Sequence, residues 1–150
     1  MTDDLAQQFN AIVAQSIPPA EFRRLQVTEL RPGYVKGAVP LEGNGNHLGT
    51  LYAGAMFGLA EIIGGALAVS SFDISRYYPV VKDLHITFRR PGRTGVTTEC
   101  TLPAARIEEL SAEADRTGKA EFVLDVNLTD DTGEVVATST ATYQIRRHGT

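Results

Sequence analysis

The sequence predicts an α+β domain in which a curved antiparallel sheet wraps around one long central helix. The first observation behind this prediction is the stretch from Ala53 to Ser71, which is apolar on nearly every helical face. A helix of that kind has to be covered nearly all round. The second observation is that the segments after it alternate apolar and polar residues with a period of two, which is typical of half-buried antiparallel strands. The chain has 150 residues, the length of one ordinary domain, so we assign residues 1–150 to a single domain.

A helix and two short strands are predicted before the apolar helix. Residues 3–15 place their apolar side chains at a one-sided helical spacing, and Pro18-Pro19 marks the end of this helix. Two strand-like runs follow, and Arg31-Pro32-Gly33 between them is a turn signal. The two runs cover Leu25–Leu30 and Tyr34–Leu41. A loop rich in glycine and asparagine, Gly43–Asn46, then leads into the apolar helix.

Four strands are predicted after the apolar helix, with a short helical segment between the second and the third. The helical segment lies between Pro103 and Gly118 and keeps its glutamates on the outer face. Asp130-Asp131-Thr132-Gly133 is typical of a hairpin turn that joins the last two strands. The alternating runs are Leu84–Phe88, Val96–Leu102, Phe122–Leu128 and Val135–Ile145. The predicted order is therefore a helix, two strands, the long helix and four strands.

The apolar stretch from Leu48 to Val69 is long enough to span a membrane. It is diluted by glycine and alanine, and it carries one charged residue, Glu61. A carboxylate in the middle of a membrane span costs about 2.5–3.5 kcal/mol. We therefore interpret this stretch as the buried helix of a soluble protein with no membrane partner. The N-terminus has neither the basic nor the apolar region of a signal peptide, so we expect a cytoplasmic protein.

Charge and cysteine content narrow the range of functions. The formal net charge of −4 disfavours a nucleic-acid partner, because a polyphosphate backbone attracts basic surfaces. The single cysteine, Cys100, lies on the apolar face of an alternating run and is expected in the core. The three histidines show no metal-ligand spacing, so we expect no metal site. The motifs of serine hydrolases and P-loop enzymes do not occur in the sequence.

The sheet of one chain could cover the apolar helix only in part, so we expect a second subunit to complete the cover. The expected assembly is a homodimer or a dimer of dimers, with the substrate channel between subunits. Pairing of the Val80–Phe88 strands across a two-fold axis would make one continuous sheet and remove an exposed edge.

Glu61 is the candidate site residue that stands out, because it is the only charged residue in the most apolar helix. A buried carboxylate has to be paired, hydrogen-bonded or shifted to a higher pKa. A carboxylate in such a place is therefore a candidate functional group. Two structural alternatives remain open, an ion pair with an arginine of the facing sheet and a contact at a subunit interface.

The loop before the helix adds candidates for the same site. Asn46 supplies an amide, and Gly49 and Gly54 allow the backbone to approach a ligand closely. The first turn of the helix presents unpaired N–H groups, which can stabilise a developing oxyanion. Ala53 and Glu61 are about two turns apart, which places both on one side of the helix. The alternative is that the glycines only form a tight turn and Asn46 only caps the helix.

These residues resemble the signature of hot-dog-fold thioesterases of the phenylacetyl-CoA and 4-hydroxybenzoyl-CoA types. That signature has Asn or Gln, a glycine, His-Gly-Gly and then an acidic residue seven places after the second of these glycines. The corresponding residues here are Asn46, Gly49, Tyr52-Ala53-Gly54 and Glu61. The strand Leu84–Gly92 resembles the third strand of the family, which ends in a similar basic-proline element. The resemblance extends from about Leu25 to Ile145 and points to a less characterised branch of the superfamily.

The resemblance implies the hot-dog fold and an acyl-CoA thioesterase activity. Glu61 would act on the thioester as general base or nucleophile, and the backbone N–H of Ala53 would polarise the thioester carbonyl. Gly54 would allow the carbonyl to approach closely, and Asn46 would hold the carbonyl or the water. The candidates for binding coenzyme A or the acyl group are Tyr52, Met56, Phe57, Arg89 and Arg90. Coenzyme A would be part of the substrate, and no separate cofactor would be needed.

Two departures from the signature keep other functions open. Tyr52-Ala53-Gly54 replaces His-Gly-Gly, and Gly65 stands where some relatives have a hydroxyl that orients water. The first alternative is therefore a non-catalytic hot-dog domain that binds or senses acyl-CoA. The second is a hydratase or dehydratase on the same fold, which requires a histidine beside the carboxylate, and His47 is the nearby candidate.

Overall fold

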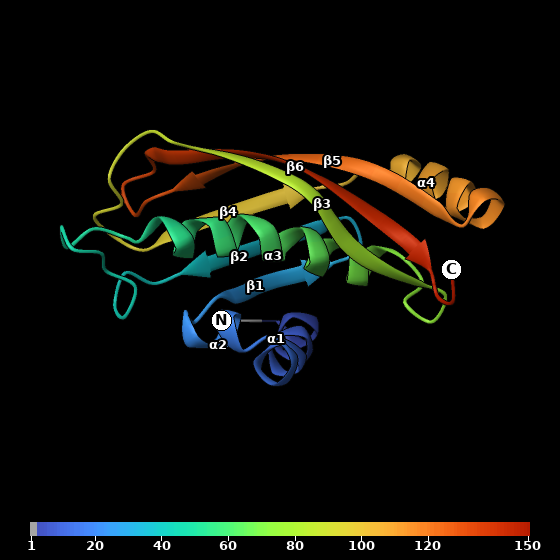
Figure 1. Ribbon diagram of the computed structural model, residues 1–150, viewed down its shortest axis with the longest axis horizontal. Helices are drawn as coiled ribbons and strands as arrows, with labels where there is room; N and C mark the ends of the chain where they lie inside the picture. Colours follow the sequence, from blue (N-terminus) through green and yellow to red (C-terminus); the bar gives the residue numbers. More distant parts are fainter. Residues whose placement is uncertain (1–2) are drawn as a thin grey trace.

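An antiparallel sheet of six strands curves around helix α3 in the computed structural model, which describes residues 3–150 (Figure 1). Helices α1 and α2 lie beside β1, and α4 packs against β5 and β6 (Figure 1). The helices are α1 (Asp4–Ser16), α2 (Pro18–Phe22), α3 (Ala53–Ser71) and α4 (Ala104–Thr117). The strands are β1 (Gln26–Arg31), β2 (Tyr34–Val39), β3 (Tyr77–Phe88), β4 (Val96–Thr101), β5 (Lys119–Thr129) and β6 (Val135–Arg147). The predicted α+β class, with a curved sheet around a long central helix, is confirmed.

The strands do not follow chain order within the sheet, which runs β1-β2-β4-β5-β6-β3. The first strand after α3, β3, crosses to the far edge and pairs with β6 from Tyr77↔Arg147 to Phe88↔Ala137. This leaves β1 and β3 as the two edge strands. The edge strand β3 contains the predicted run Val80–Phe88, and its outer side has no strand neighbour within residues 3–150.

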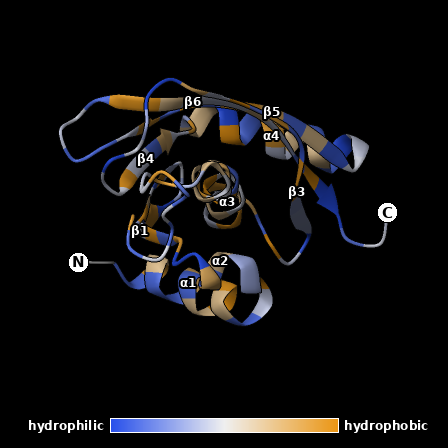
Figure 2. Cartoon of the chain, turned by 60° about the vertical axis from the view of Figure 1, so that its left-hand side comes forward, coloured by the Kyte–Doolittle hydropathy of each residue, from blue (hydrophilic) through white to orange (hydrophobic). Residues whose placement is uncertain are grey.

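Helix α3 forms the centre of the core, as its composition predicts. Leu59, Ile63 and Leu67 are almost completely buried against the sheet. Figure 2 shows α3 seen nearly along its axis, with the curve of the sheet around it. Among the described residues, α3 is the one helix long and apolar enough to cross a membrane, but more than half of it is buried inside the domain. Its position is that of a core helix.

One side of α3 is not covered by the sheet. We call this side the α3 strip, and its residues are wholly or partly exposed in the single chain. A helix turns by about 100° per residue, so these positions fall on one face. The α3 strip consists of Ala53, Gly54, Phe57, Gly58, Glu61 and Gly65. The sheet of one chain therefore covers α3 only in part, as the sequence predicts.

Tyr143 of β6 fixes the middle of α3 to the sheet. Its buried hydroxyl donates its one hydrogen to a shared hydrogen bond with the backbone carbonyls of Ala60, at 3.2 Å, and Glu61, at 2.9 Å. The ring lies against Gly64, where an added Cβ would overlap it. The absence of a side chain at Gly64 therefore allows this close approach, and Tyr143 holds the helical turn that carries Glu61.

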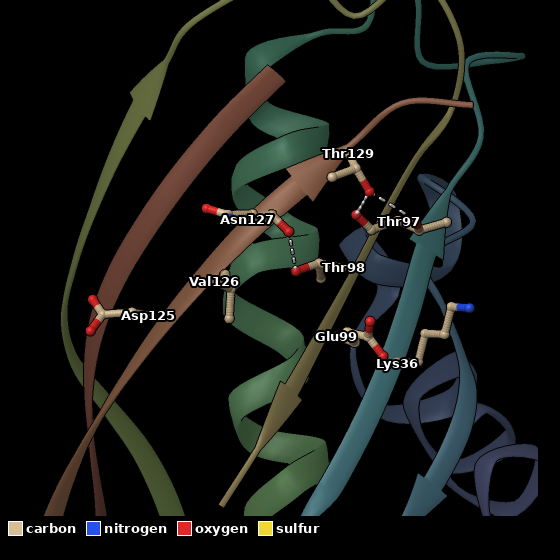
Figure 3. Close-up of a pocket in the computed structure, with 8 residues that line it drawn as sticks. All are labelled: Lys36, Thr97, Thr98, Glu99, Asp125, Val126, Asn127 and Thr129. Carbon is tan, nitrogen blue, oxygen red and sulfur yellow. Dashed lines mark hydrogen bonds between the residues drawn. The ribbon is translucent and has the colours of Figure 1, made fainter. Parts of the chain in front are cut away.

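The sheet has a gap between β4 and β5 (Figure 3). These two strands pair only at Thr97↔Thr129. Next to this pair, the hydroxyl of Thr98 donates to the carbonyl of Asn127 at 2.7 Å, so a side chain bridges the strands there. The strands then diverge around a polar cleft of about 370 Å³. The chain between these two strands forms α4, the helix predicted between Pro103 and Gly118.

The N-terminal segment differs in one respect from its prediction. The first helix ends at Ser16, and Pro18-Pro19 does not lead directly into a strand but begins the short helix α2. Proline is tolerated in the first turn of a helix, because its missing N–H has no partner there in any case. The same two prolines therefore end one helix and start another. As a result, α2 packs beside α3 next to the α3 strip.

The adjacent glycines Gly64 and Gly65 should respond in opposite ways to replacement by alanine. Gly64→Ala should lower the free energy of unfolding by about 1–3 kcal/mol, because the methyl group overpacks against Tyr143. Gly65→Ala should raise it by about 0.5–1 kcal/mol, because a Cβ there meets no heavy atom within 4 Å and alanine favours the helix. Urea unfolding of both variants measures these effects. Equal destabilisation of the two variants would contradict the packing described here.

Candidate active site

The carboxylate of Glu61 has no partner within residues 3–150. It lies mostly buried in the middle of the α3 strip, and no arginine of the facing sheet pairs with it. Burial is the single cause that raises its pKa above the ordinary value of about 4.5. Of the two structural alternatives, an intrachain ion pair is therefore not found among the described residues.

Glu61 lines a small cleft between α2 and α3, which we call the Glu61 cleft. Its volume is about 200 Å³, and most of its walls are apolar. The lining residues are Ile17, Pro19, Ala20, Arg23, Leu25, Gly54, Gly58, Glu61 and Ile62. The cleft thus combines a mostly apolar interior with two charged side chains.

The N-terminus of α3 presents two backbone donors without acceptors. Tyr52 is the N-cap residue, and no side chain caps this helix. The N–H groups of Ala55 and Met56 both donate to the carbonyl of Tyr52, at 3.0 and 3.3 Å. The N–H groups of Ala53 and Gly54 have no acceptor among the described residues. This is the arrangement expected of a site that stabilises a negatively charged oxygen.

Asn46 does not cap α3. Its side-chain oxygen accepts hydrogen bonds from the backbone N–H groups of Leu48, at 2.9 Å, and Thr50, at 3.1 Å. Its amide nitrogen donates to the hydroxyl of Thr50 at 2.9 Å. Gly49 turns the loop with φ of 76°, in the left-handed region. Asn46 and Gly49 therefore shape the loop that precedes the helix.

A second cleft lies at the N-terminus of α3, and we call it the Ala53 cleft. Its volume is about 310 Å³, and it brings together several of the predicted site residues. It is lined by Asn46, Thr50, Leu51, Ala53, Met56, Phe88, Arg89, Arg90, Pro91 and Gly92. Arg89 and Arg90 also line an adjoining cleft of about 460 Å³ with Glu134. The guanidinium of Arg90 lies 3.8 Å from the carboxylate of Glu134, and both side chains are exposed.

The structure separates the two groups that the sequence places on one side of the helix. Ala53 and Glu61 both belong to the α3 strip, but they line different clefts. Eight residues of helix correspond to about 12 Å along the axis. A carboxylate and an N–H donor that far apart cannot act on the same carbonyl group. A single chain therefore does not bring Ala53 and Glu61 together, although Gly54, the residue with the second open N–H donor, lines the Glu61 cleft.

The other candidates differ in their surroundings. Met56 is buried in the Ala53 cleft, whereas Phe57 is 42% exposed on the α3 strip. Tyr52 is also exposed, and the guanidinium of Arg23 lies over its ring, 5.1 Å from the ring centre. His47 is exposed and does not line the Glu61 cleft. The histidine that a hydratase needs beside the carboxylate is thus not found within the described chain.

Two further residues bear on the chemistry of the chain. Cys100 is buried, and burial raises the pKa of its thiol to about 11, so a reactive thiolate is rare at neutral pH. Arg23 was not among the residues singled out from the sequence, because no local pattern indicates that α2 packs against α3.

Within residues 3–150, no group of three or more His, Cys, Asp or Glu side chains could hold a metal ion.

The curved sheet around one long helix is the hot-dog fold, and comparison with known proteins supports this class. Residues 6–145 match the family described as a domain of unknown function, DUF4442. The chain belongs to this family. No curated protein matches the sequence. The predicted relationship to hot-dog thioesterases is confirmed by this match together with the solved structures described next.

The chain is similar to several solved structures. A protein of unknown function from Pseudomonas aeruginosa, described as a probable thioesterase, is 47% identical, with a TM-score of 0.86 over 91% of this chain and 92% of that one. A thioesterase from Haemophilus influenzae is 16% identical, with a TM-score of 0.74 over 97% and 94% of the two chains. A mutant thioesterase from Pseudomonas aeruginosa is 21% identical, with a TM-score of 0.74 over 98% and 96%. The similarity of this chain to the last two structures shows the fold alone.

Replacing Glu61 with glutamine should make the protein more stable at neutral pH. The pKa of Glu61 is higher in the folded chain than in the unfolded chain, so its contribution to stability is full at low pH. That contribution is lost as the pH rises through the raised pKa. Glu61→Gln should therefore raise Tm at about pH 7, and the difference from the wild type should shrink towards about pH 4.

Thermal unfolding between these pH values measures the effect. Glu113→Gln on the exposed face of α4 is the matched control and should show no such pH-dependent difference. A Glu61→Gln protein that is no more stable than the wild type at any pH would contradict the burial of an unpartnered carboxylate.

Proposed function

We propose that this protein is an acyl-CoA thioesterase in which Glu61 is the general base or the nucleophile. The observation that carries the proposal is the mostly buried, unpartnered carboxylate of Glu61, on the same helical strip as two open N–H donors. Buried carboxylates without partners are typical of catalytic sites. The likeness to proteins described as thioesterases supports the same reaction class.

In the proposed reaction, the thioester carbonyl lies against the N–H groups of Ala53 and Gly54. Glu61 accepts a proton from water while the water oxygen attacks the carbonyl carbon, and the resulting oxyanion is stabilised at the helix N-terminus. The carbon–sulfur bond then breaks, and the leaving thiolate takes up a proton. The products are a carboxylic acid and the free thiol of coenzyme A. In the alternative route, the Glu61 carboxylate attacks the carbonyl carbon, the carbon–sulfur bond breaks and the thiolate of coenzyme A leaves. Water then hydrolyses the resulting anhydride to the carboxylic acid and free Glu61.

The site in this proposal forms between two copies of the chain. Phe57 lies midway between Ala53 and Glu61 in the α3 strip. If a two-fold axis passes beside Phe57, Glu61 of one chain faces the partner subunit's Ala53, and the same contact repeats at a second site. The strip is partly exposed, and the strand β3 has an open edge that could pair with its copy. The proposed assembly is thus a homodimer, or a dimer of two such dimers.

Coenzyme A would bind at the Ala53 cleft as part of the substrate. The guanidinium groups of Arg89 and Arg90 suit its phosphates, because a planar fork of donors matches phosphate oxygens. Met56, with Tyr52 and Phe57 near the same end of α3, would contact the acyl or pantetheine chain. Asn46, in the loop that precedes α3, would hold the carbonyl or the attacking water. A cytoplasmic location remains a prediction from the sequence.

An acyl-CoA sensor without catalysis is the second candidate function. One observation favours it, namely the open space at Gly65, one turn after Glu61. No hydroxyl is present there to orient a water molecule. Binding of acyl-CoA without release of thiol over hours would identify the protein as a sensor.

Release of free thiol from a panel of short, medium, long and aromatic acyl-CoAs tests the proposed activity. We expect turnover by the wild type and a loss of at least about 100-fold in Glu61→Gln, the usual scale for removal of a general base. Glu113→Gln should retain full activity, because that residue lies on the exposed face of α4. Hydrolysis that Glu61→Gln leaves unchanged would refute the assignment of Glu61.

Complementation between two inactive variants tests whether the site is shared by two chains. Ala53→Pro removes one N–H donor at the first helical position, where proline is tolerated. Tyr52 already has φ of −62° and ψ of 135°, a conformation that suits a residue before proline. Each variant alone, Ala53→Pro or Glu61→Gln, should be at least about 100-fold less active.

Co-expression of the two variants should recover about a quarter of the wild-type activity. About half of the dimers are then mixed, and each mixed dimer has one intact site of two. The proportion of mixed dimers can be checked with two different affinity tags. Mixed dimers without any recovered activity would rule out a shared site.

A further inference from the structure

Arg23 is the single cation that lines the Glu61 cleft. It directly follows α2, and its side chain is partly exposed. The remaining walls of the cleft come from apolar residues of α2 and α3 and from Ile17 and Leu25, which flank α2 on either side. Two charges of opposite sign therefore share a small apolar space, one on α3 and one at the end of α2.

The backbone of Arg23 is held in place from two sides. Its carbonyl accepts a hydrogen bond of 2.7 Å from the side-chain amide of Asn44, which is 4% exposed. The same amide also donates to the carbonyl of Pro40 at 3.0 Å. The N–H of Arg23 donates to the carbonyl of Pro19 at 3.3 Å. Arg23 is thus fixed relative to both α2 and the end of β2.

The guanidinium of Arg23 is oriented but has no anionic partner. It lies over the ring of Tyr52, 5.1 Å from the ring centre, in a cation–π contact. No carboxylate of residues 3–150 pairs with it. Glu61 shares the cleft but is not an ion-pair partner, and burial alone affects the pKa of Glu61. Arg23 and Glu61 thus line one cleft of about 200 Å³ without forming an ion pair with each other.

We propose that Arg23 binds a carboxylate at the far end of the acyl chain, so that the preferred substrates are monothioesters of short dicarboxylic acids. This inference rests on the proposed thioesterase function. The thioester carbonyl would lie beside Glu61, and the methylene groups of the acyl chain would lie along the apolar walls. A guanidinium fork matches a carboxylate through two parallel hydrogen bonds.

The size and position of the cleft favour an acyl carboxylate over a phosphate of coenzyme A. A volume of about 200 Å³ is below the roughly 300–1,000 Å³ of pockets that enclose drug-sized ligands. It suits a chain of a few carbons and is too small for the nucleotide part of coenzyme A. The cations suited to the nucleotide, Arg89 and Arg90, line the other cleft.

Glutaryl-CoA and valeryl-CoA provide a matched pair of probes, because both acyl chains have five carbons and only the first ends in a carboxylate. Wild-type protein should hydrolyse glutaryl-CoA with a kcat/KM about 10- to 100-fold higher, the scale of a hydrogen-bonded charge pair. Arg23→Gln should abolish this preference by lowering the rate for glutaryl-CoA alone. Arg116→Gln, an exposed arginine in the last turn of α4, is the control and should keep the preference.

Two results would overturn the inference. One is an equal loss with both substrates in Arg23→Gln, which would indicate a contact with coenzyme A or a structural role. The other is a wild-type protein that hydrolyses valeryl-CoA as well as glutaryl-CoA or better.

Calorimetric binding to the Glu61→Gln variant separates this inference from the proposed function. If the wild type hydrolyses neither these two substrates nor any acyl-CoA of the panel, the thioesterase proposal fails, but binding still tests Arg23. Tighter binding of glutaryl-CoA than of valeryl-CoA, lost when Arg23→Gln is added, would support the anion site. Equal binding of the two would overturn it.

Discussion

Helix α3 has apolar side chains around most of its circumference, and the rest of the fold is arranged to keep that surface from water. A curved sheet can enclose such a helix on several sides, whereas a flat sheet would cover only one face. The enclosure remains incomplete, because the edge strands β1 and β3 do not meet. The α3 strip lies in the opening between them, flanked by α2. The groups available for chemistry on this helix are therefore those that the sheet cannot reach.

The same constraint explains why a carboxylate is tolerated in this helix. On the sheet side of α3, an unpaired charge would be fully desolvated, at a cost of several kcal/mol. On the strip, Glu61 is mostly buried yet still open to a small cleft, so its pKa rises while it can still meet a ligand. Tyr143 binds the carbonyls of the same helical turn from the opposite side. The sheet thus holds the backbone of this turn, while its acidic side chain faces away from the sheet.

Local patterns predicted the elements well and their packing poorly. The all-round apolar character of residues 53–71 and the period-two runs after it identified the central helix and the strands that follow it, because each pattern lies within one element. The interpretation of Pro18-Pro19 missed α2, because proline is compatible with both the end and the start of a helix. The sequence does not identify Arg23 as a site residue, because its position at the site depends on α2 packing against α3. The distance between Ala53 and Glu61 follows from helix geometry, but their separate clefts depend on elements far away in the sequence.

The gap beside α4 divides the sheet into two three-stranded halves, β1-β2-β4 and β5-β6-β3. One residue pair and the Thr98 hydroxyl join them directly, and α3 packs against both. Backbone amides that face the gap are not protected by a strand ladder, so they should exchange with solvent deuterons faster than those between β5 and β6. The long helix α3 thus connects the two halves of the sheet, and the loss of its packing would release the two halves from each other.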